Sequence, residues 1–148
     1  TQIARSTFNI DPQRMYLMGH SMGGAGTLFL GQKHAEYWAA IAAIAPAAFM
    51  MQPTQKEILA PLKAANIPVM ITEGSIDNVV PPESVRTWAA AASELDMAHE
   101  YLEIEGMDHG TIIGASMPDI FRFFAEHKRT LPPPSGPRGG PPLPRASN

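Results

Sequence analysis

The amino-acid sequence predicts an α/β domain in which a parallel sheet of about four strands is flanked by helices. The prediction rests on the alternation of apolar runs with helical patterns, in the order β-α-β-α-β-α-β-α. The apolar runs do not alternate with polar residues, which is typical of parallel strands that are covered on both faces. Since a helix follows each strand, the strands should run parallel, with helices on both faces of the sheet.

A glycine-rich turn and a helix connect the first two predicted strands. The first strand is expected at residues 15–18, and the glycines behind it lead into a helix at residues 24–34. Residues 37–45 contain the run AAIAAIA. Its position between two helical patterns predicts a second buried strand, although its alanines also suit a helix.

A capping box marks the next helix. Thr54 and Glu57 have the spacing in which each side chain bonds the other's backbone N–H, so we expect a helix at residues 54–63. Pro61 is unfavourable inside that helix. The run IPVMIT at residues 67–72 predicts the third strand.

The last two units are a helix with its strand and a closing helix. Pro82 and Glu83 suit a first helical turn, and Trp88 is expected on the apolar face that follows. Residues 99–105 alternate and predict a half-exposed strand near an edge of the sheet. Residues 118–128 predict an amphipathic helix.

Composition excludes several classes of function. The chain of 148 residues is long enough for one domain with a real core. Its net charge of −3 gives no reason to expect nucleic acid as a partner. It has no cysteine, which excludes disulfides and thiolate catalysis, and no apolar run long enough for a membrane span.

Two segments are expected in the chain. Residues 1–130 are expected to carry the predicted strands and helices of the folded core. Residues 131–148 are rich in proline and glycine and contain no acidic residue, which predicts a disordered tail. A ligand for a proline-recognition domain is the alternative interpretation of that tail.

A nucleophile turn is predicted where the first strand ends, because residues 19–23 read Gly-His-Ser-Met-Gly. G-x-S-x-G between a strand and a helix makes a tight turn that strains the serine backbone and lifts its hydroxyl clear of the sheet. Gly19 and Gly23 are expected to be glycines because a Cβ at either place would collide with the turn. Ser21 is therefore the candidate nucleophile, and the Met22 N–H is the candidate oxyanion donor.

A serine nucleophile needs a base and an orienting acid, and two later strands each end near a candidate. Asp77 follows the third strand in GSIDNVVP, and His109 follows the fourth in GMDHG. Because the carboxyl ends of parallel strands share one edge, we expect both to meet Ser21 there. Two other acids are weaker candidates: Asp108 is adjacent to His109 and poorly placed to hold its ring, and Glu73 ends the third strand.

These motifs resemble the α/β-hydrolase superfamily over roughly residues 9–126. GHSMGG, GSIDNVVP and GMDHG look like its nucleophile elbow, acid loop and histidine loop. The stretch NIDPQRMYLMGHSMGG is similar to the serine esterase branch that includes feruloyl and acetyl-xylan esterases, polyester depolymerases and dienelactone-hydrolase-like proteins. Secreted peptidase-like hydrolases share this branch. The resemblance is compatible with a secreted, periplasmic or cytoplasmic protein.

The resemblance also implies a partial fold, from the nucleophile elbow onward. The superfamily has about four strands before the elbow, together with a loop that usually supplies a second oxyanion N–H. Only some 14 residues precede the elbow here, so we expect the chain to correspond to the C-terminal part of such a hydrolase. The first strand would then be an apolar, unpaired edge of the sheet.

The expected substrate-contacting residues are His20 in the elbow and Phe49 and Met50 after the second strand. Each has a plainer interpretation, because His20 could pack beneath the site and the other two could belong to the core. The histidines do not pair at metal-ligand spacing, so no metal or other cofactor is expected.

The favoured function is hydrolysis of a carboxylic ester, small or polymer-linked, through an acyl-enzyme with Ser21, His109 and Asp77 as the triad. A peptidase of the same fold is the first alternative. A catalytically silent fragment is the second.

Overall fold

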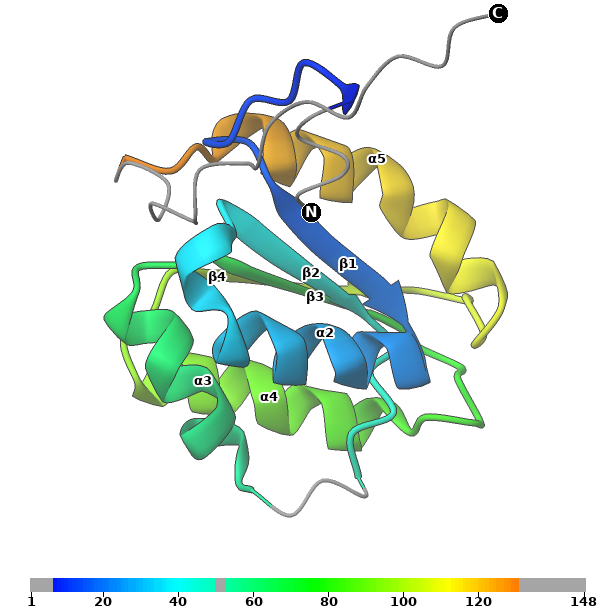
Figure 1. Cartoon of the computed structure of the whole chain (residues 1–148). Coiled ribbons are helices and arrows are strands. Elements are labelled where there is room, and N and C mark those ends of the chain that lie inside the picture. The colour runs from blue at the N-terminus through cyan, green and yellow to red at the C-terminus, as the bar shows by residue number, and fades with distance from the viewer. Residues whose placement is uncertain (1–6, 50–52, 131–148) are drawn as a thin grey trace, which may run out of the picture.

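A computed structural model of the chain describes residues 7–49 and 53–130. In these segments four parallel strands form one sheet in the order β1-β2-β3-β4, and helices lie on both of its faces, so the predicted fold class is confirmed (Figure 1). The strands are β1 (Tyr16–His20), β2 (Ala40–Ile44), β3 (Val69–Gly74) and β4 (His99–Ile104). The helices are α2 (Met22–Lys33), the 3₁₀ turn η1 (Ala35–Tyr37), α3 (Gln55–Ala64), α4 (Pro82–Glu94) and α5 (Thr111–Glu126).

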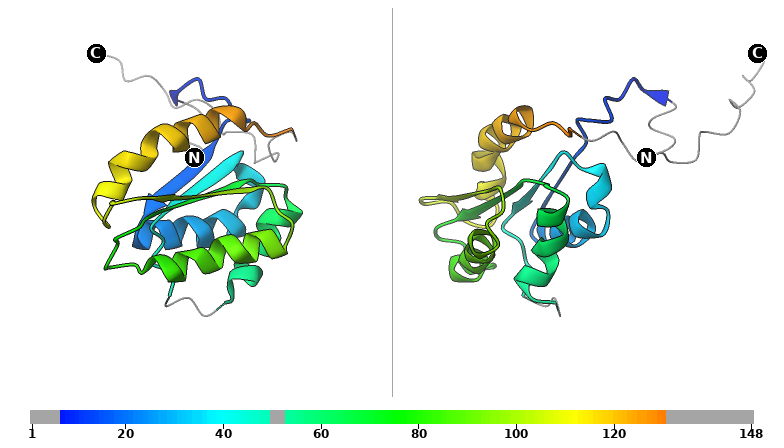
Figure 2. Two further views of the ribbon diagram at one scale, coloured as in Figure 1. Left: turned by 180° about the vertical axis from the view of Figure 1, so that it is seen from behind. Right: turned by 90° about the vertical axis from the view of Figure 1, so that its left-hand side faces the viewer.

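The sheet separates two apolar cores. Helices α2, α3 and α4 cover one face and α5 covers the other, as the two further views make plain (Figure 2). On β2, Ile41 packs toward the three helices, whereas its neighbours Ala40 and Ala42 pack toward α5. Trp88 of α4 is buried in the first core, as its sequence pattern predicts.

The central and outer strands differ in burial. Every residue of β2 and β3 is buried, whereas β4 is half-buried along its whole length, as expected for a strand at an edge. Within the described residues β1 pairs only with β2 and forms the opposite edge. Met18 on β1 is 38% exposed, so this edge presents apolar surface, as predicted.

The capping box at the start of α3 is present. The Thr54 hydroxyl accepts a hydrogen bond from the Glu57 N–H at 3.3 Å, and the Thr54 N–H donates to Glu57 Oε2 at 2.7 Å. The helix continues through Pro61 despite the lost N–H. Since Ile58, Leu59 and Leu62 are buried against the sheet, tertiary packing outweighs the unfavourable proline.

The main error in the predicted elements concerns the last helix, which begins at Thr111 rather than at residue 118. Pro118 lies in its interior and does not mark its start. The helix begins earlier because Asp108 Oδ1 accepts hydrogen bonds from the Gly110 and Thr111 N–H groups and so caps the first turn. Consequently α5 starts directly behind His109.

The second and third strands are also displaced from their predicted ranges. Tyr37 belongs to η1, so β2 starts only at Ala40. β3 runs two residues beyond the predicted end and includes Glu73 and Gly74. Glu73 is therefore part of the strand, and it is buried.

Candidate active site

The turn after β1 holds Ser21 in a strained conformation. Its φ of 56° and ψ of −120° place a residue with a side chain in a region that few residues other than glycine adopt. Three backbone hydrogen bonds hold it there: Ser21 N–H donates to Ile44 at 2.9 Å, and its carbonyl accepts from Ala25 and Ala47, each at 3.0 Å. The predicted strain is present, and the ends of two strands and a helix maintain it.

Of the two glycines predicted to be sterically required, Gly19 is confirmed. A Cβ on Gly19 would collide with the Gly23 carbonyl and lie 2.9 Å from Thr27 Oγ1. The prediction for Gly23 is wrong, because a Cβ there would meet no atom of the described segments within 4 Å. The second tight position is Gly24, where a Cβ would lie 2.8 Å from the Ile44 carbonyl oxygen and 3.0 Å from Pro46 Cα. The first turn of α2 points residue 23 to solvent and residue 24 at β2.

Three side chains from three strand ends form a continuous hydrogen-bonded chain. Ser21 Oγ lies 2.9 Å from His109 Nε2, and His109 Nδ1 lies 2.7 Å from Asp77 Oδ2. A carboxylate accepts hydrogen bonds only, so Nδ1 carries the proton and the neutral ring leaves Nε2 free to accept one from the serine. The parallel sheet brings together residues that are 88 and 32 positions apart.

The environment of Asp77 favours its charged form. Its side chain is fully buried, and burial alone would raise its pKa. The N–H groups of Val80 and Val79 donate to Oδ1 at 2.9 and 2.8 Å, and His109 bonds Oδ2. Together with the attraction between the carboxylate and a protonated His109, these bonds outweigh the burial and lower the pKa of Asp77 below its usual value. The carboxylate therefore remains ionised beside the imidazole.

The loops that carry Asp77 and His109 are bonded to each other. Gly106 N–H donates to Ser75 Oγ at 2.9 Å, and Ile76 N–H donates to the Met107 carbonyl at 3.1 Å. A Cβ on Gly74 would collide with that same Met107 carbonyl, so the loops approach closely only because residue 74 is glycine. The sequence analysis assigned no role to Gly74 or Ser75, although this G-S pair opens the acid loop GSIDNVVP.

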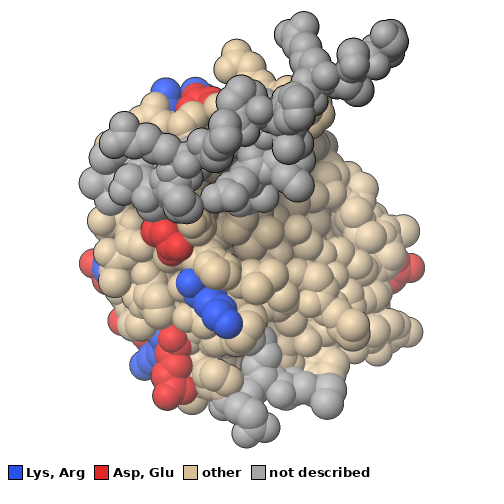
Figure 3. Space-filling view, in the orientation of Figure 1, with Lys and Arg blue, Asp and Glu red and all other residues tan. Residues whose placement is uncertain are grey.

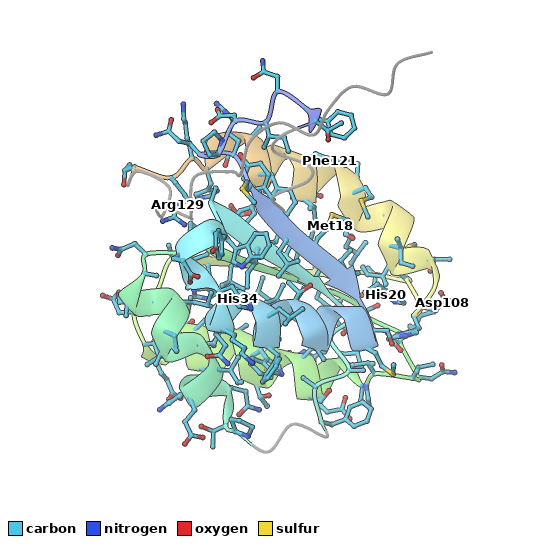
Figure 4. The ribbon with its side chains drawn as sticks, viewed as in Figure 1. Met18, His20, His34, Asp108, Phe121 and Arg129 are labelled. Atoms are coloured by element: carbon cyan, nitrogen blue, oxygen red, sulfur yellow. The ribbon has the colours of Figure 1, made fainter. Side chains whose placement is uncertain are left out.

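His20 contacts the loop that carries His109. Its Nε2 donates to the His109 carbonyl oxygen at 2.8 Å, and the two rings lie 4.4 Å apart between centroids. Figure 4 shows His20 at the end of β1, on the same side of the molecule as the loop that carries Asp108. Of the two expected substrate contacts after β2, Phe49 is exposed, and Met50 lies outside the described residues.

The two weaker candidate acids are placed elsewhere. Asp108 is occupied at the start of α5, where Oδ1 also accepts from Thr111 Oγ1 at 2.7 Å, and it makes no bond to the His109 ring. Glu73 is fully buried near the end of β3, where its Oε1 accepts the Gly74 N–H at 2.8 Å. Neither bonds the imidazole that Asp77 holds.

Four exposed apolar side chains lie close in sequence to residues of the site. Met22 follows Ser21, Phe49 lies two residues beyond the Ala47 that bonds the Ser21 carbonyl, and Ile76 and Val79 flank Asp77. These four side chains are 57–81% exposed and are named here the apolar rim. Figure 3 shows that charges are few on the right-hand half of its face, where β1 ends.

Residues 7–49 and 53–130 contain neither a group of side chains that could hold a metal ion nor a membrane-spanning helix. No group of three or more His, Cys, Asp or Glu side chains there could hold a metal ion. No helix there is long and apolar enough to cross a bilayer.

In sequence and fold the chain is similar to known hydrolases. The mouse (Mus musculus) S-formylglutathione hydrolase is 42% identical over 45 residues, which are 30% of this chain and 16% of the mouse protein. The structure of a thermostable esterase superimposes with a TM-score of 0.71 and 26% identity, covering 86% of this chain and 35% of that one. A ferulic acid esterase from Anaeromyces mucronatus shares the fold, with a TM-score of 0.66 and 20% identity over 79% of this chain and 47% of its own.

The chain thus spans well under two thirds of each of these proteins. The family model described as PET hydrolase-like matches residues 2–129, which is nearly the whole chain. With an α/β-hydrolase sheet, a strained serine elbow and this family match, the chain belongs to the PET hydrolase-like family.

Proposed function

We propose that this chain is a serine hydrolase that cleaves carboxylic esters through an acyl-enzyme. The observation that carries the proposal is the hydrogen-bonded chain from Ser21 Oγ through His109 to Asp77, with heavy-atom distances of 2.9 and 2.7 Å. These are the distances at which a base can take the proton of a nucleophile. Membership of the PET hydrolase-like family supports hydrolysis as the reaction class.

In the first half of the reaction Ser21 is acylated. His109 Nε2 takes the hydroxyl proton while Oγ forms a bond to the ester carbonyl carbon. The Met22 N–H opens α2, has no acceptor within the helix, and donates to the developing oxyanion. When the tetrahedral intermediate collapses, the bond to the leaving alcohol breaks and His109 returns the proton to that oxygen.

In the second half water releases the acyl group. His109 accepts a proton from water as its oxygen attacks the acyl carbon, and then protonates Ser21 Oγ as the carboxylic acid departs. Asp77 stays ionised throughout, holds the Nδ1–H tautomer and stabilises the imidazolium.

The apolar rim supports an ester with an apolar acyl or aryl group. Met22, Phe49, Ile76 and Val79 offer exposed apolar surface beside the nucleophile. The name of one similar protein, a ferulic acid esterase, and the name of the PET hydrolase-like family both refer to aromatic esters. We therefore include aromatic esters in the proposed substrate class.

The test is labelling by a fluorophosphonate, with the modified residue located by mass spectrometry, followed by turnover of an aryl ester. We expect the label on Ser21, and we expect Ser21→Ala to lower kcat by about 10⁴-fold or more. Ser93→Ala is the matched control, because Ser93 Oγ also lies near a histidine, 3.2 Å from His99 Nε2. The His99 Nδ1 bonds a carbonyl oxygen instead of a carboxylate, so Ser93 should be neither labelled nor required.

The outcomes separate the alternatives. A chain that takes no label on Ser21 and does not hydrolyse the ester is catalytically silent, and the proposal is then wrong. A peptide anilide cleaved in preference to the aryl ester would identify a peptidase that uses the same Ser21.

A further inference from the structure

Glu73 is a buried acid that the reaction above does not use. It lies near the end of β3 and is 0% exposed. Along β3, Val69 and Ile71 pack on the face covered by α2, α3 and α4, so by alternation Glu73 points to that face as well. Its neighbours on that side are Asp77 in the following loop and Glu103, which lies directly opposite on β4.

The hydrogen bonds of Glu73 are incomplete in its charged form. Oε1 accepts the Gly74 N–H at 2.8 Å, but the buried Oε2 has no hydrogen-bond partner among residues 7–49 and 53–130. A charged carboxylate oxygen without a donor inside a protein is very costly. Burial therefore raises the pKa of Glu73 to about 8; the Gly74 N–H opposes this, and Asp77 and the charge on Glu103 add to it.

The other charged groups on that side are paired with one another. The Arg86 guanidinium of α4 donates two hydrogen bonds to Glu103, at 2.6 and 2.9 Å, and the Tyr101 hydroxyl donates to Glu103 Oε2 at 2.7 Å. His109, in the histidine loop, bonds Asp77. Arg86 and Tyr101 thus donate their hydrogen bonds to Glu103 and not to Glu73. A protonated Glu73 in turn needs an acceptor for its O–H.

Asp77 has room for that hydrogen bond. A carboxylate offers about four acceptor sites, and three on Asp77 are taken by Val79 N–H, Val80 N–H and His109 Nδ1. We propose that Glu73 is a positioning residue whose protonated carboxyl donates a hydrogen bond to Asp77 while its other oxygen holds the Gly74 N–H. The inference rests on the proposed roles of Asp77, His109 and Ser21.

Such a residue makes turnover depend on the protonation of Glu73. Loss of its proton would place two negative charges side by side and remove a donor from Asp77. Asp77 would then hold the His109 ring less well, which lowers kcat, whereas KM, set by contacts at the apolar rim, would change little. We therefore expect wild-type kcat to fall above about pH 8.

Two variants test the proposal by kcat and KM on an aryl ester between pH 6 and 9.5, with the rate of Ser21→Ala subtracted at each pH. Glu73→Gln keeps a donor for Asp77 and an acceptor for Gly74, so kcat at pH 7 should stay within about twofold and the fall above pH 8 should vanish. Glu73→Leu fills the site without either bond, and kcat should fall by up to about 100-fold at every pH with KM nearly unchanged. A role in packing alone would not produce this difference in pH profile.

The result that would overturn the proposal is a Glu73→Gln profile that keeps the wild-type fall, or a wild-type profile with no fall. A second readout needs no turnover: the low-field proton resonance of the His109 Nδ1–H. It should shift between pH 7 and 9 in the wild type and stay constant in Glu73→Gln. If Ser21→Ala matched the wild type in hydrolysis, the proposed function would fail, and this resonance would still decide whether Glu73 and Asp77 are coupled.

Discussion

At the scale of single residues, the site depends on which carboxylate holds His109. Asp108 precedes His109 in the sequence, whereas Asp77 lies close to it only in the folded protein. Only Asp77 bonds the His109 ring. Asp108 is directed away because its Oδ1 is shared among the Gly110 N–H and both donors of Thr111. Asp108, next to His109 in the sequence, therefore caps α5, whereas Asp77, 32 residues away, holds the His109 ring.

We expect Asp77→Asn to lower kcat by about 10⁴-fold and Asp108→Asn to leave it within a few-fold. In the first variant the new amide would present N–H to His109 Nδ1, so the ring proton would move to Nε2, which could then no longer accept the Ser21 proton. In the second variant the amide would keep the oxygen that caps α5. Steady-state kinetics on one aryl ester measures both, and equal losses in the two variants would contradict the assignment of Asp77.

At the scale of elements, α2 packs so closely against β2 that its first turn touches strand backbone. Gly24 makes this contact, since a Cβ there would meet the Ile44 carbonyl oxygen at 2.8 Å. The same carbonyl accepts the Ser21 N–H. The contact that packs the helix therefore also shapes the nucleophile turn.

Two neighbouring glycines give a matched pair for this contact. Gly24→Ala should destabilise the protein by about 1–3 kcal/mol, because backbone atoms must shift to admit the methyl group. Gly23→Ala should be neutral or stabilise by up to about 1 kcal/mol, because the site is open and Ala favours helix. Urea unfolding of both variants measures the difference, and a larger loss for Gly23→Ala would contradict the close packing of α2 on β2 at Gly24.

At the scale of the whole molecule, the buried carboxyl of Glu73 links folding stability to pH. Its pKa is raised from 4.5 to about 8 in the folded protein. A group with a raised pKa contributes stability that is fully present below its unfolded pKa and is lost as pH rises to its folded pKa. Stability from Glu73 should thus decline between pH 4.5 and about 8.

Thermal or urea unfolding at pH 5.5 and pH 9 measures this decline. We expect the wild type to lose at least about 1 kcal/mol more than Glu73→Gln over this interval, because Gln has no proton to lose. The variant shares every other titrating group, so the difference between the two proteins isolates Glu73. Parallel pH dependences of the two proteins would show that folding does not raise the pKa of Glu73, which would contradict its burial as a neutral acid.

The sequence by itself determined the features that rest on local patterns. The alternation of apolar runs with helices was sufficient for a parallel sheet, and Gly-His-Ser-Met-Gly between a strand and a helix was sufficient for the strained Ser21. The carboxyl ends of parallel strands must share an edge, so sequence order alone also predicted that Ser21, Asp77 and His109 would lie close together.

Only the tertiary structure decided the features that depend on what packs against a residue. Gly24 is the tight glycine of the nucleophile turn because β2 lies against it and not against Gly23. Glu73 has the same letters around it whether its side chain is exposed or buried. The burial that sets its protonation comes from the fold, in which Glu103 of β4 lies directly opposite Glu73.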